Sequence, residues 1–525
     1  MPAGDCAVIP IISLFLVFFT EFSEHRIFCM KNIISRYWPV FALLVLSIPL
    51  YFLNVHDIHG WGDDYAQYIR EADNIAHGRP FYRSGYVFNA QNIDYAPPQY
   101  PPGYPLLLAP IVKAFGLLIR PMLYLNAVLL SGFLFILFAY FRKYASPVVS
   151  ICIAVIAVYC GFLLEYKQNV LSDLPCTVFV ALYLLVRRDA KNDRWRTFGL
   201  IVIGTIAILI RTQAIMLVVA EITIAVLIAA KQFYRDGKFA KVQWRILVVP
   251  LGILALQWCI TSIFFKSPAS TLHYYSKMSV GFNSGLLIVV AEDFNYFMDL
   301  LGSIFYYPLC NSVTGPVITL AMRLSLICCL HGFLMTIRKR LAVEDVLFIL
   351  FFLLVLIIPV RQGFRLLLPV FLVILFYCYQ SLKVLVTSAL GFKNAWIAVG
   401  ITVAYLVGGA NAFKASLAIQ TAGTPYDDDS KGAFQYIRQN VGDSDVIIFP
   451  RPRALTLYTG KKSMVAATQL TFEENAQLIK KIGARYLLVS NANDFGWYNG
   501  YLRNSGSAID SVRINDTYTL YSLKQ

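Results

Sequence analysis

Two adjacent carboxylates, Asp63 and Asp64, follow an apolar run that ends near Asn54. Ionised groups beside the hydrocarbon of a membrane are costly, so acids placed there indicate a use for their charge. A partly desolvated carboxylate can act as a general base, because burial moves its pKa toward neutrality. The simpler interpretation is a helix cap, since Asp is a good N-cap and residues 65–75 have helical spacing, with Tyr68 on the buried face. Spacing alone leaves both interpretations open.

A proline-aromatic segment follows, with Gln99 ahead of Pro101-Pro102-Gly103 and with Tyr100 and Tyr104 on either side of that run. The prolines fix an extended backbone and remove N–H donors. The aromatic rings suit a sugar or a lipid phosphate at a membrane interface. A rigid loop within an aromatic belt is the competing interpretation.

A third acid, Asp173, stands at the start of a later apolar run, in the sequence Leu171-Ser172-Asp173-Leu174-Pro175. An N-cap with proline in the first turn explains this spacing without a function. The alternative is an acid that faces the same cavity as Asp63 and Asp64.

Three arginines lie inside or at the ends of apolar runs, namely Arg211, Arg361 and Arg365. Cations in such places need partners, and a lipid phosphate is a suitable one. The competing interpretations are structural ion pairs with the acids above, or side chains that reach the interface.

The rest of the chain is typical of a polytopic α-helical membrane protein. Of its 525 residues, 58% are hydrophobic and 14% are charged, against about 25% charged in soluble domains. The net charge of +15 fits basic residues in short loops, which set topology, better than it fits nucleic-acid binding. About 20 apolar residues are needed to cross a bilayer. About eleven runs are candidate spans: 37–54, 122–141, 147–165, 173–187, 196–210, 212–230, 245–265, 314–337, 345–360, 366–386 and 395–413.

The positive-inside rule orients these predicted spans. Lys and Arg gather in alternate loops, which places the residues before Tyr37 inside and the loops 55–121 and 266–312 outside. Residues 31–415 form the predicted membrane domain. Residues 1–30 are an N-terminal extension of uncertain status: Met30 resembles a natural start, and a genuine extra helix is the alternative.

Residues 424–525 are more polar and predict a small extracytoplasmic α/β domain. Helical spacing covers 430–440 and 472–482, the second with a capping box from Thr471 to Glu474. Three strand-like runs lie at 446–449, 486–489 and 518–521.

In this order, the motifs resemble the GT-C superfamily of membrane glycosyltransferases, and in particular the bacterial aminoarabinose transferase and protein O-mannosyltransferase group. The resemblance covers roughly residues 31–413. It rests on Asp63-Asp64 with Tyr68, on the segment from Tyr100 to Leu108, and on three later motifs: Leu171-Ser172-Asp173-Leu174-Pro175, Leu209-Ile210-Arg211-Thr212 and Phe364-Arg365-Leu366-Leu367-Leu368-Pro369.

The resemblance implies an inverting transfer of a sugar from a polyprenyl-phosphate donor to a glycolipid, polysaccharide or protein, on the outer face of the inner membrane. Alignment on Tyr68 makes Asp64 the catalytic base with Asp63 beside it, and the alternative register exchanges the two. The implied substrate-binding residues are Tyr68, Gln99, Tyr100, Tyr104, Asp173, Arg211, Arg361 and Arg365. Arg211 and Arg365 match cations near the donor phosphate.

One departure from the family bears on cofactors. The aminoarabinose transferase group has an acid and a lysine before its Pro-Pro pair, where this chain has Gln99 and Tyr100. This argues against a metal that bridges the two loops and against lipid A aminoarabinose transfer; a divalent metal stays open as a cofactor.

The competing function is a lipid-linked saccharide flippase or transporter. Such proteins more often show inverted repeats, broken helices and acids near mid-span. In this chain the acids and the cations of 361–365 gather at the outer ends of the predicted spans. A structural envelope protein would leave those charges unexplained.

Overall fold

The computed structural model describes most of the chain beyond residue 36. The described residues are 37–88, 97–188, 194–236, 244–265, 294, 296, 298, 300–301, 315–357, 363–390, 395–410, 414, 423–467, 470–491, 496–505 and 508–524. The predicted extension 1–30, most of the predicted loop 266–312 and Arg361 lie outside them.

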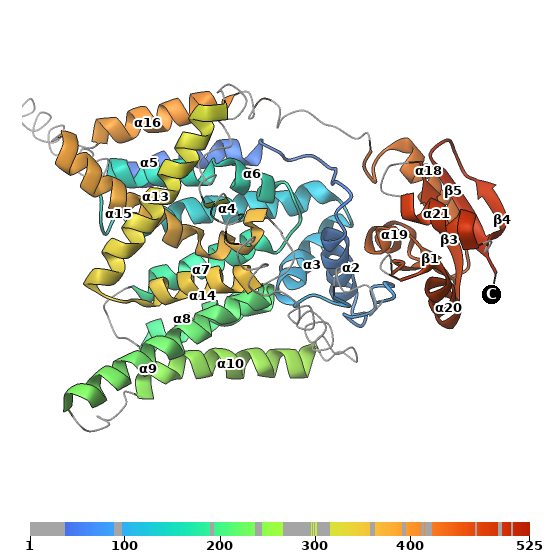
Figure 1. The fold of residues 1–525 in the computed structure, drawn as a ribbon, viewed down its shortest axis with the longest axis horizontal. Helices are drawn as coiled ribbons and strands as arrows, with labels where there is room; N and C mark the ends of the chain where they lie inside the picture. The colour runs from blue at the N-terminus through green and yellow to red at the C-terminus, as the bar shows by residue number, and fades with distance from the viewer. Residues whose placement is uncertain are drawn as a thin grey trace, which may run out of the picture.

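Apolar helices make up the larger part of the molecule (Figure 1). Beyond the helix Tyr37–Tyr51, they are α4 (Ile119–Phe141), α5 (Pro147–Val158), α6 (Gly161–Lys167), α7 (Asp173–Arg187), α8 (Arg194–Ile210), η2 (Thr212–Ile215), α9 (Met216–Asp236), α10 (Trp244–Phe264), α13 (Gly315–Lys339), α14 (Val343–Ile357), η6 (Gly363–Leu366), η7 (Leu368–Val370), α15 (Phe371–Leu390) and α16 (Ala395–Gly408). Each of the eleven predicted spans coincides with one of these helices or with a consecutive pair. The predicted helical class is therefore confirmed.

Several of these helices have the length and composition to cross a membrane. Among the described residues, 4 helices pass this test on their own, or up to 5 if α5 and α6, which are bent by 58°, form one span. Large apolar side chains such as Phe198, Trp258 and Ile263 are exposed on the helices, as expected where lipid covers them. The number of eleven crossings stays a prediction.

Two helices of the first loop pack on one end of this body: α2 (Asp64–Ala76) and α3 (Gly103–Phe115). Tyr68, predicted to lie on the buried face of α2, is buried, but so are residues around most of the helix, including Tyr65, Glu71 and Asp73. The first residue of α3, Gly103, touches the last turn of α8: a Cβ at this position would lie 2.5 Å from the backbone carbon of Leu209. Only glycine allows this approach without a shift of the backbone.

The C-terminal domain is a five-stranded mixed sheet with helices, in the strand order β2-β1-β3-β5-β4. Strands β1 and β2 and strands β1 and β3 pair in parallel, whereas β5 is antiparallel to β3 and β4. Its elements are α18 (Asp428–Asn440), β1 (Val446–Ile448), α19 (Pro452–Thr459), β2 (Lys462–Met464), α20 (Phe472–Ile482), β3 (Ala484–Ser490), α21 (Gly496–Ser505), β4 (Ala508–Arg513) and β5 (Tyr518–Leu523).

Every element predicted for this domain is present. The capping box of Thr471 and Glu474 at the start of α20 is also confirmed. The sequence analysis missed α19, β2, α21 and β4, which are short or lack clear periodicity. In Figure 1, α19 is the part of this domain that faces α2.

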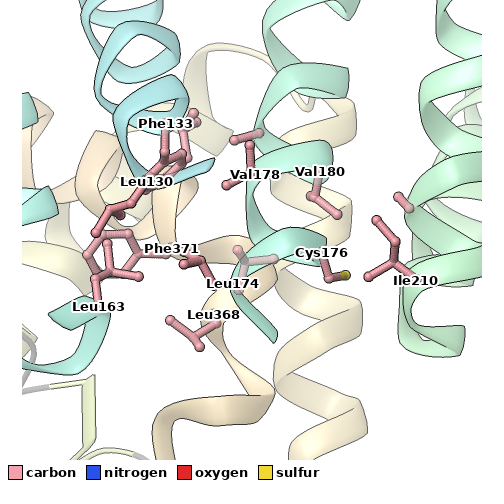
Figure 2. Packing of buried hydrophobic residues seen from close by; sticks show 14 of the residues in the cluster. Leu130, Phe133, Leu163, Leu174, Cys176, Val178, Val180, Ile210, Leu368 and Phe371 are labelled. Carbon is pink, nitrogen blue, oxygen red and sulfur yellow. The ribbon is translucent and has the colours of Figure 1, made fainter. Parts of the chain in front are cut away.

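A dry core lies directly behind the acid at the start of α7. Figure 2 shows Leu174, Val178 and Val180 of α7 facing apolar side chains of neighbouring helices, including Leu130 and Phe133 of α4. Leu368 and Phe371 close the same cluster from η7 and α15. All of these side chains are buried. The core fixes α7 and η6–η7 relative to each other, and these elements carry Asp173 and Arg365.

Candidate active site

The carboxylate of Asp173 is the centre of a network of acids and cations. The Nε of Arg365 donates to both of its oxygens, at 2.8 and 2.9 Å. The Nη1 of Arg211 lies 2.9 Å from Oδ1 of the same carboxylate. Asp173 is the first residue of α7, after Ser172 at the N-cap position, where the side chain makes no cap hydrogen bond to this fully described helix. The interpretation of Asp173 as an N-cap is therefore wrong, and its partners are cations.

The same arginine joins the first loop to this network. The Nη2 of Arg365 lies 2.7 Å from Oδ2 of Asp64, so one guanidinium bridges acids that are more than 100 positions apart in the sequence. The side chain of Asp64 is 23% exposed, whereas that of Asp173 is fully buried. Planar Arg–carboxylate contacts of this kind are strong and directional.

Three tyrosines line the network. The hydroxyl of Tyr68 lies 2.8 Å from Oγ of Ser172, and that of Tyr100 donates to Oδ1 of Asp64 at 2.6 Å. The Tyr68 ring stacks on Tyr100, with a centroid distance of 4.5 Å, and meets Tyr104 edge-on at 5.1 Å. The structure thus brings together seven of the predicted site residues: Asp64, Tyr68, Tyr100, Tyr104, Asp173, Arg211 and Arg365.

Two further predicted residues have no hydrogen bond or ion pair to this cluster within the described part of the chain. Gln99 is half-buried, and its Oε1 has no hydrogen-bond partner among the described residues. Arg361 lies outside the described part of the chain, so its predicted role stays a prediction.

Asp63 has different partners from its neighbour. Its Oδ1 accepts hydrogen bonds from the backbone N–H groups of Arg453 and Ala454, both at 3.1 Å. These groups belong to the first turn of α19, where N–H donors lack partners within the helix and the helix dipole favours an anion. Asp63 also occupies the N-cap position of α2 but makes no side-chain cap bond to that helix, which is described in full. It caps a helix of the other domain instead.

The sequence analysis missed Arg453, which enters the site from α19. Its side chain is among the largest that are fully buried. Its Nη1 donates to the hydroxyl of Tyr100 at 3.0 Å and its Nη2 donates to the carbonyl of Pro97. Arg453 also lies 3.8 Å from Oδ1 of Asp64 and 3.9 Å from Oδ2 of Asp63. Its only sequence signal is Pro450-Arg451-Pro452-Arg453 ahead of a helix too short to show a periodicity.

The two neighbouring acids have opposite electrostatic environments. Burial raises the pKa of Asp63 to about 6, because Arg453 and the N–H of Ala454 offset only part of the lost hydration. Burial also acts to raise the pKa of Asp64, but Arg365, Arg453 and the Tyr100 hydroxyl outweigh it and lower the pKa to about 2. Asp64 is therefore ionised in this state and held by two cations.

Contacts between the first loop and the C-terminal domain extend well beyond Asp63. Trp61 packs against Phe434 and Phe449, with ring centroids 6.1 and 5.8 Å apart. The hydroxyls of Tyr65 and Tyr458 are 3.0 Å apart. Residues 85–87 pair with the edge of β2, where the N–H of Val87 donates to the carbonyl of Ser463 at 2.8 Å and that of Ser463 donates to Gly85 at 3.2 Å.

The cluster does not suit a metal ion. Among the described residues, no group of three or more His, Cys, Asp or Glu side chains could hold one. The carboxylates that meet here face guanidinium groups, which would repel a cation. We therefore derive no step through a metal.

Comparison with solved structures identifies the architecture. ArnT from Cupriavidus metallidurans bound to undecaprenyl phosphate aligns over 93% of this chain and 98% of its own, with 12% identity and a TM-score of 0.55. The archaeal oligosaccharyltransferase AglB from Archaeoglobus fulgidus, in complex with an inhibitory peptide and a dolichol-phosphate, aligns over 87% of this chain and 70% of its own, with 12% identity and a TM-score of 0.53. The chain has the GT-C fold.

The predicted resemblance to GT-C enzymes is thus confirmed at the level of the fold. ArnT in the apo state aligns with similar values, at 13% identity and a TM-score of 0.56. No protein-family model and no curated protein sequence matches the chain. The function proposed for the chain therefore depends on the geometry of the site.

Proposed function

We propose that this protein is an inverting glycosyltransferase that moves a hexosyl or pentosyl group from a polyprenyl-phosphate donor to an envelope acceptor. The observation that carries the proposal is the bridge of Arg365 between Asp64 and Asp173, with Arg211 on the same carboxylate. This network places Asp64, a carboxylate that can act as a base, beside Arg365 and Arg211, two guanidinium groups that can bind a phosphate. The solved structures of ArnT and AglB, which have the same fold, are complexes with undecaprenyl phosphate and with a dolichol-phosphate.

The two arginines are suited to the donor phosphate. A guanidinium presents its N–H groups in a planar fork that matches phosphate oxygens as well as it matches carboxylates. In the described state these forks are occupied by Asp64 and Asp173, which neutralise them. A phosphodiester would compete with the two carboxylates for Arg365 and Arg211, and the loss of an ion pair at Asp64 would accompany donor binding.

The reaction that follows uses Asp64 as the base. When Arg365 turns to the phosphate, Asp64 loses one of the cations that lower its pKa. Burial then raises the pKa of Asp64 toward the working range. The carboxylate takes the proton from the acceptor hydroxyl or amine, whose oxygen or nitrogen bonds to the anomeric carbon. The bond from that carbon to the phosphate oxygen breaks with its electron pair, and polyprenyl phosphate leaves with an additional negative charge. Arg365 and Arg211 stabilise that charge.

The assignment of Asp64 rather than Asp63 follows from what each carboxylate contacts. One oxygen of Asp63 accepts two backbone hydrogen bonds from α19, and the residue is 8% exposed. The side chain of Asp64 is 23% exposed and faces Arg365. An acceptor can therefore reach Asp64 without separating the two domains.

We place the site on the outer face of the cell membrane, with the C-terminal domain extracytoplasmic. The acceptor is a glycolipid, a polysaccharide or a protein. Tyr100, which is partly exposed, supplies the aromatic surface beside the sugar, and the buried Tyr68 and Tyr104 support it from behind. Gln99, next to Tyr100, is the further substrate-binding residue that we propose.

The test uses the full chain in lipid nanodiscs with a panel of radiolabelled sugars on undecaprenyl phosphate. Membranes from cells that lack the gene supply the acceptor. We expect at least one donor to give labelled product and free undecaprenyl phosphate, and Asp64→Asn to abolish this while the exposed control Asp510→Asn does not. Movement of lipid-linked sugar between leaflets of a liposome without a new glycosidic bond would instead establish the flippase.

A further inference from the structure

We propose that Arg453 of the C-terminal domain is a positioning residue of the transfer site: it orients Asp64 through Tyr100 and keeps that carboxylate charged when Arg365 turns to the donor phosphate. This inference rests on the proposed function. It gives the C-terminal domain a specific task, which is to complete the site from outside the membrane helices.

Arg453 lies between the two acids. Its Nη1 lies 3.8 Å from Asp64 and its Nε lies 3.9 Å from Asp63. Nη1 also donates to the hydroxyl of Tyr100, which in turn donates to Asp64 at 2.6 Å. Arg453 thus acts on Asp64 both directly, by charge, and through a hydrogen-bonded tyrosine.

This arginine is held rigidly. Its guanidinium carbon lies 4.8 Å from the ring centroid of Tyr86 and 4.9 Å from that of Tyr100. Stacking of this kind strengthens when the cation is desolvated. Nη2 is held by the carbonyl of Pro97, and the backbone of Arg453 is held by Asp63. A phosphate would have to displace all of these contacts to bind Arg453, whereas the guanidinium of Arg365 pairs with the carboxylates of Asp64 and Asp173.

The loop beneath Arg453 is itself fixed. The backbone N–H of Tyr100 donates to Oε1 of Glu71 at 3.1 Å, and Nε2 of Gln67 donates to the same oxygen at 2.7 Å. Burial raises the pKa of Glu71 to about 8, so this group is mainly protonated at neutral pH and adds little negative charge. The position of the Tyr100 hydroxyl is therefore set by α2 and α19 together.

The consequence concerns the protonation of Asp64 during turnover. The charged and titratable groups that face it are Arg365 from η6, Arg453 from α19, Tyr100 from the loop, Tyr68 on its own helix and Asp63 beside it. Once Arg365 binds phosphate, Arg453 is the remaining cation. If Arg453 were absent from the docked domain, burial and Asp63 would favour a neutral Asp64, which cannot accept a proton. A working base thus requires the cation that the docked domain supplies.

The experiment compares Arg453→Met and Arg453→Lys with the exposed control Arg438→Met on α18. Sugar transfer is measured from pH 4 to 9 at saturating donor, and undecaprenyl phosphate binding is measured separately. We expect Arg453→Met to lower kcat roughly 10-fold to 100-fold and to move the acidic limb of the kcat profile upward by about one pH unit. Donor affinity should change less than about threefold. Arg453→Lys should recover part of both effects because it restores the charge.

A second variant keeps the test independent of folding. Tyr100→Phe retains the stacked ring, loses the hydroxyl between Arg453 and Asp64, and should move the acidic limb in the same direction; Tyr521→Phe is its control. An unchanged acidic limb in Arg453→Met and Tyr100→Phe, with the domain docked, overturns the inference and leaves the proposed function intact. If the unmodified protein transfers no sugar from any donor, the proposed function itself fails.

Discussion

The Oδ1 of Asp63 lies 3.1 Å from the backbone nitrogen of Arg453, so a carboxylate of the first loop caps a helix of the C-terminal domain. Its neighbour Asp64 pairs instead with Arg365 from the helical body at 2.7 Å. Adjacent acids thus have separate tasks: one holds the domain in place, and the other belongs to the site that the domain covers.

The first prediction concerns how the stability of the folded protein depends on pH through Asp63. Burial raises the pKa of Asp63 from its ordinary value of 3.8 to about 6. Between these values the folded state binds a proton that the unfolded state has lost, so this residue makes stability fall as the pH rises from about 4 to about 6. Asp63→Asn should flatten that slope, as measured by thermal unfolding of the full chain across this range. A slope equal to that of the unmodified protein would contradict the assignment, and Asp510→Asn is the matched control.

The second prediction separates the two roles of Asp64. Asp64→Asn removes the base, which should lower transfer roughly 100-fold or more. The same change frees Arg365 from a competing carboxylate, so the affinity for undecaprenyl phosphate should rise. Both quantities can be measured on one preparation, by transfer of labelled sugar and by equilibrium binding of the lipid. A loss of binding together with transfer would instead mean that Asp64 supports the structure of the site.

Sequence reasoning found the helical part of the site because charges in apolar runs stand out. Asp64, Asp173, Arg211 and Arg365 each interrupt or border such a run, and the cost of burying them predicted partners nearby. The sequence did not determine which partners these residues have, since a helix cap, an ion pair and a phosphate ligand are all compatible with the spacing. In the structure, η6 and α7 bring Arg365 beside Asp173, and the two side chains form an ion pair.

The contribution of the C-terminal domain could not be found in this way. Arg453 lies in a polar region, where an arginine carries no signal, and α19 spans only Pro452–Thr459. Its burial depends on the docking of that helix against the first loop, which joins residues almost 400 positions apart. The interpretation of Asp63 as a cap was correct in kind, but the helix that it caps is α19 rather than its own.

The third prediction uses charge compensation at Arg365. Arg365→Gln leaves two carboxylates, Asp64 and Asp173, without one of their cations, and such a loss destabilises by up to about 3–5 kcal/mol. The double variant Arg365→Gln/Asp64→Asn removes one charge of each sign, leaves Asp173 paired with Arg211 and should recover most of the thermal stability. It should not recover undecaprenyl phosphate binding, which we expect to be roughly 10-fold to 100-fold weaker in both variants. Recovery of binding together with stability would make Arg365 a structural residue only.

The last prediction concerns Gly103, which sits where α3 meets the end of α8. A Cβ added here would lie 2.5 Å from the backbone carbon of Leu209 and 2.6 Å from the nitrogen of Ile210. Backbone atoms cannot rotate aside, so Gly103→Ala must separate the two helices, at a cost of about 1–3 kcal/mol.

The same displacement reaches the proposed phosphate ligand Arg211, which directly follows α8, and the neighbouring site residue Tyr104, which directly follows Gly103. Gly103→Ala should therefore lower both the thermal unfolding temperature and undecaprenyl phosphate affinity. The control is Gly132→Ala in α4, where the added Cβ meets nothing within 4 Å and helix propensity favours alanine. If Gly103→Ala unfolds and binds like this control, α3 and α8 do not meet as closely as the structure has them, and the placement of Arg211 beside Asp173 loses its support.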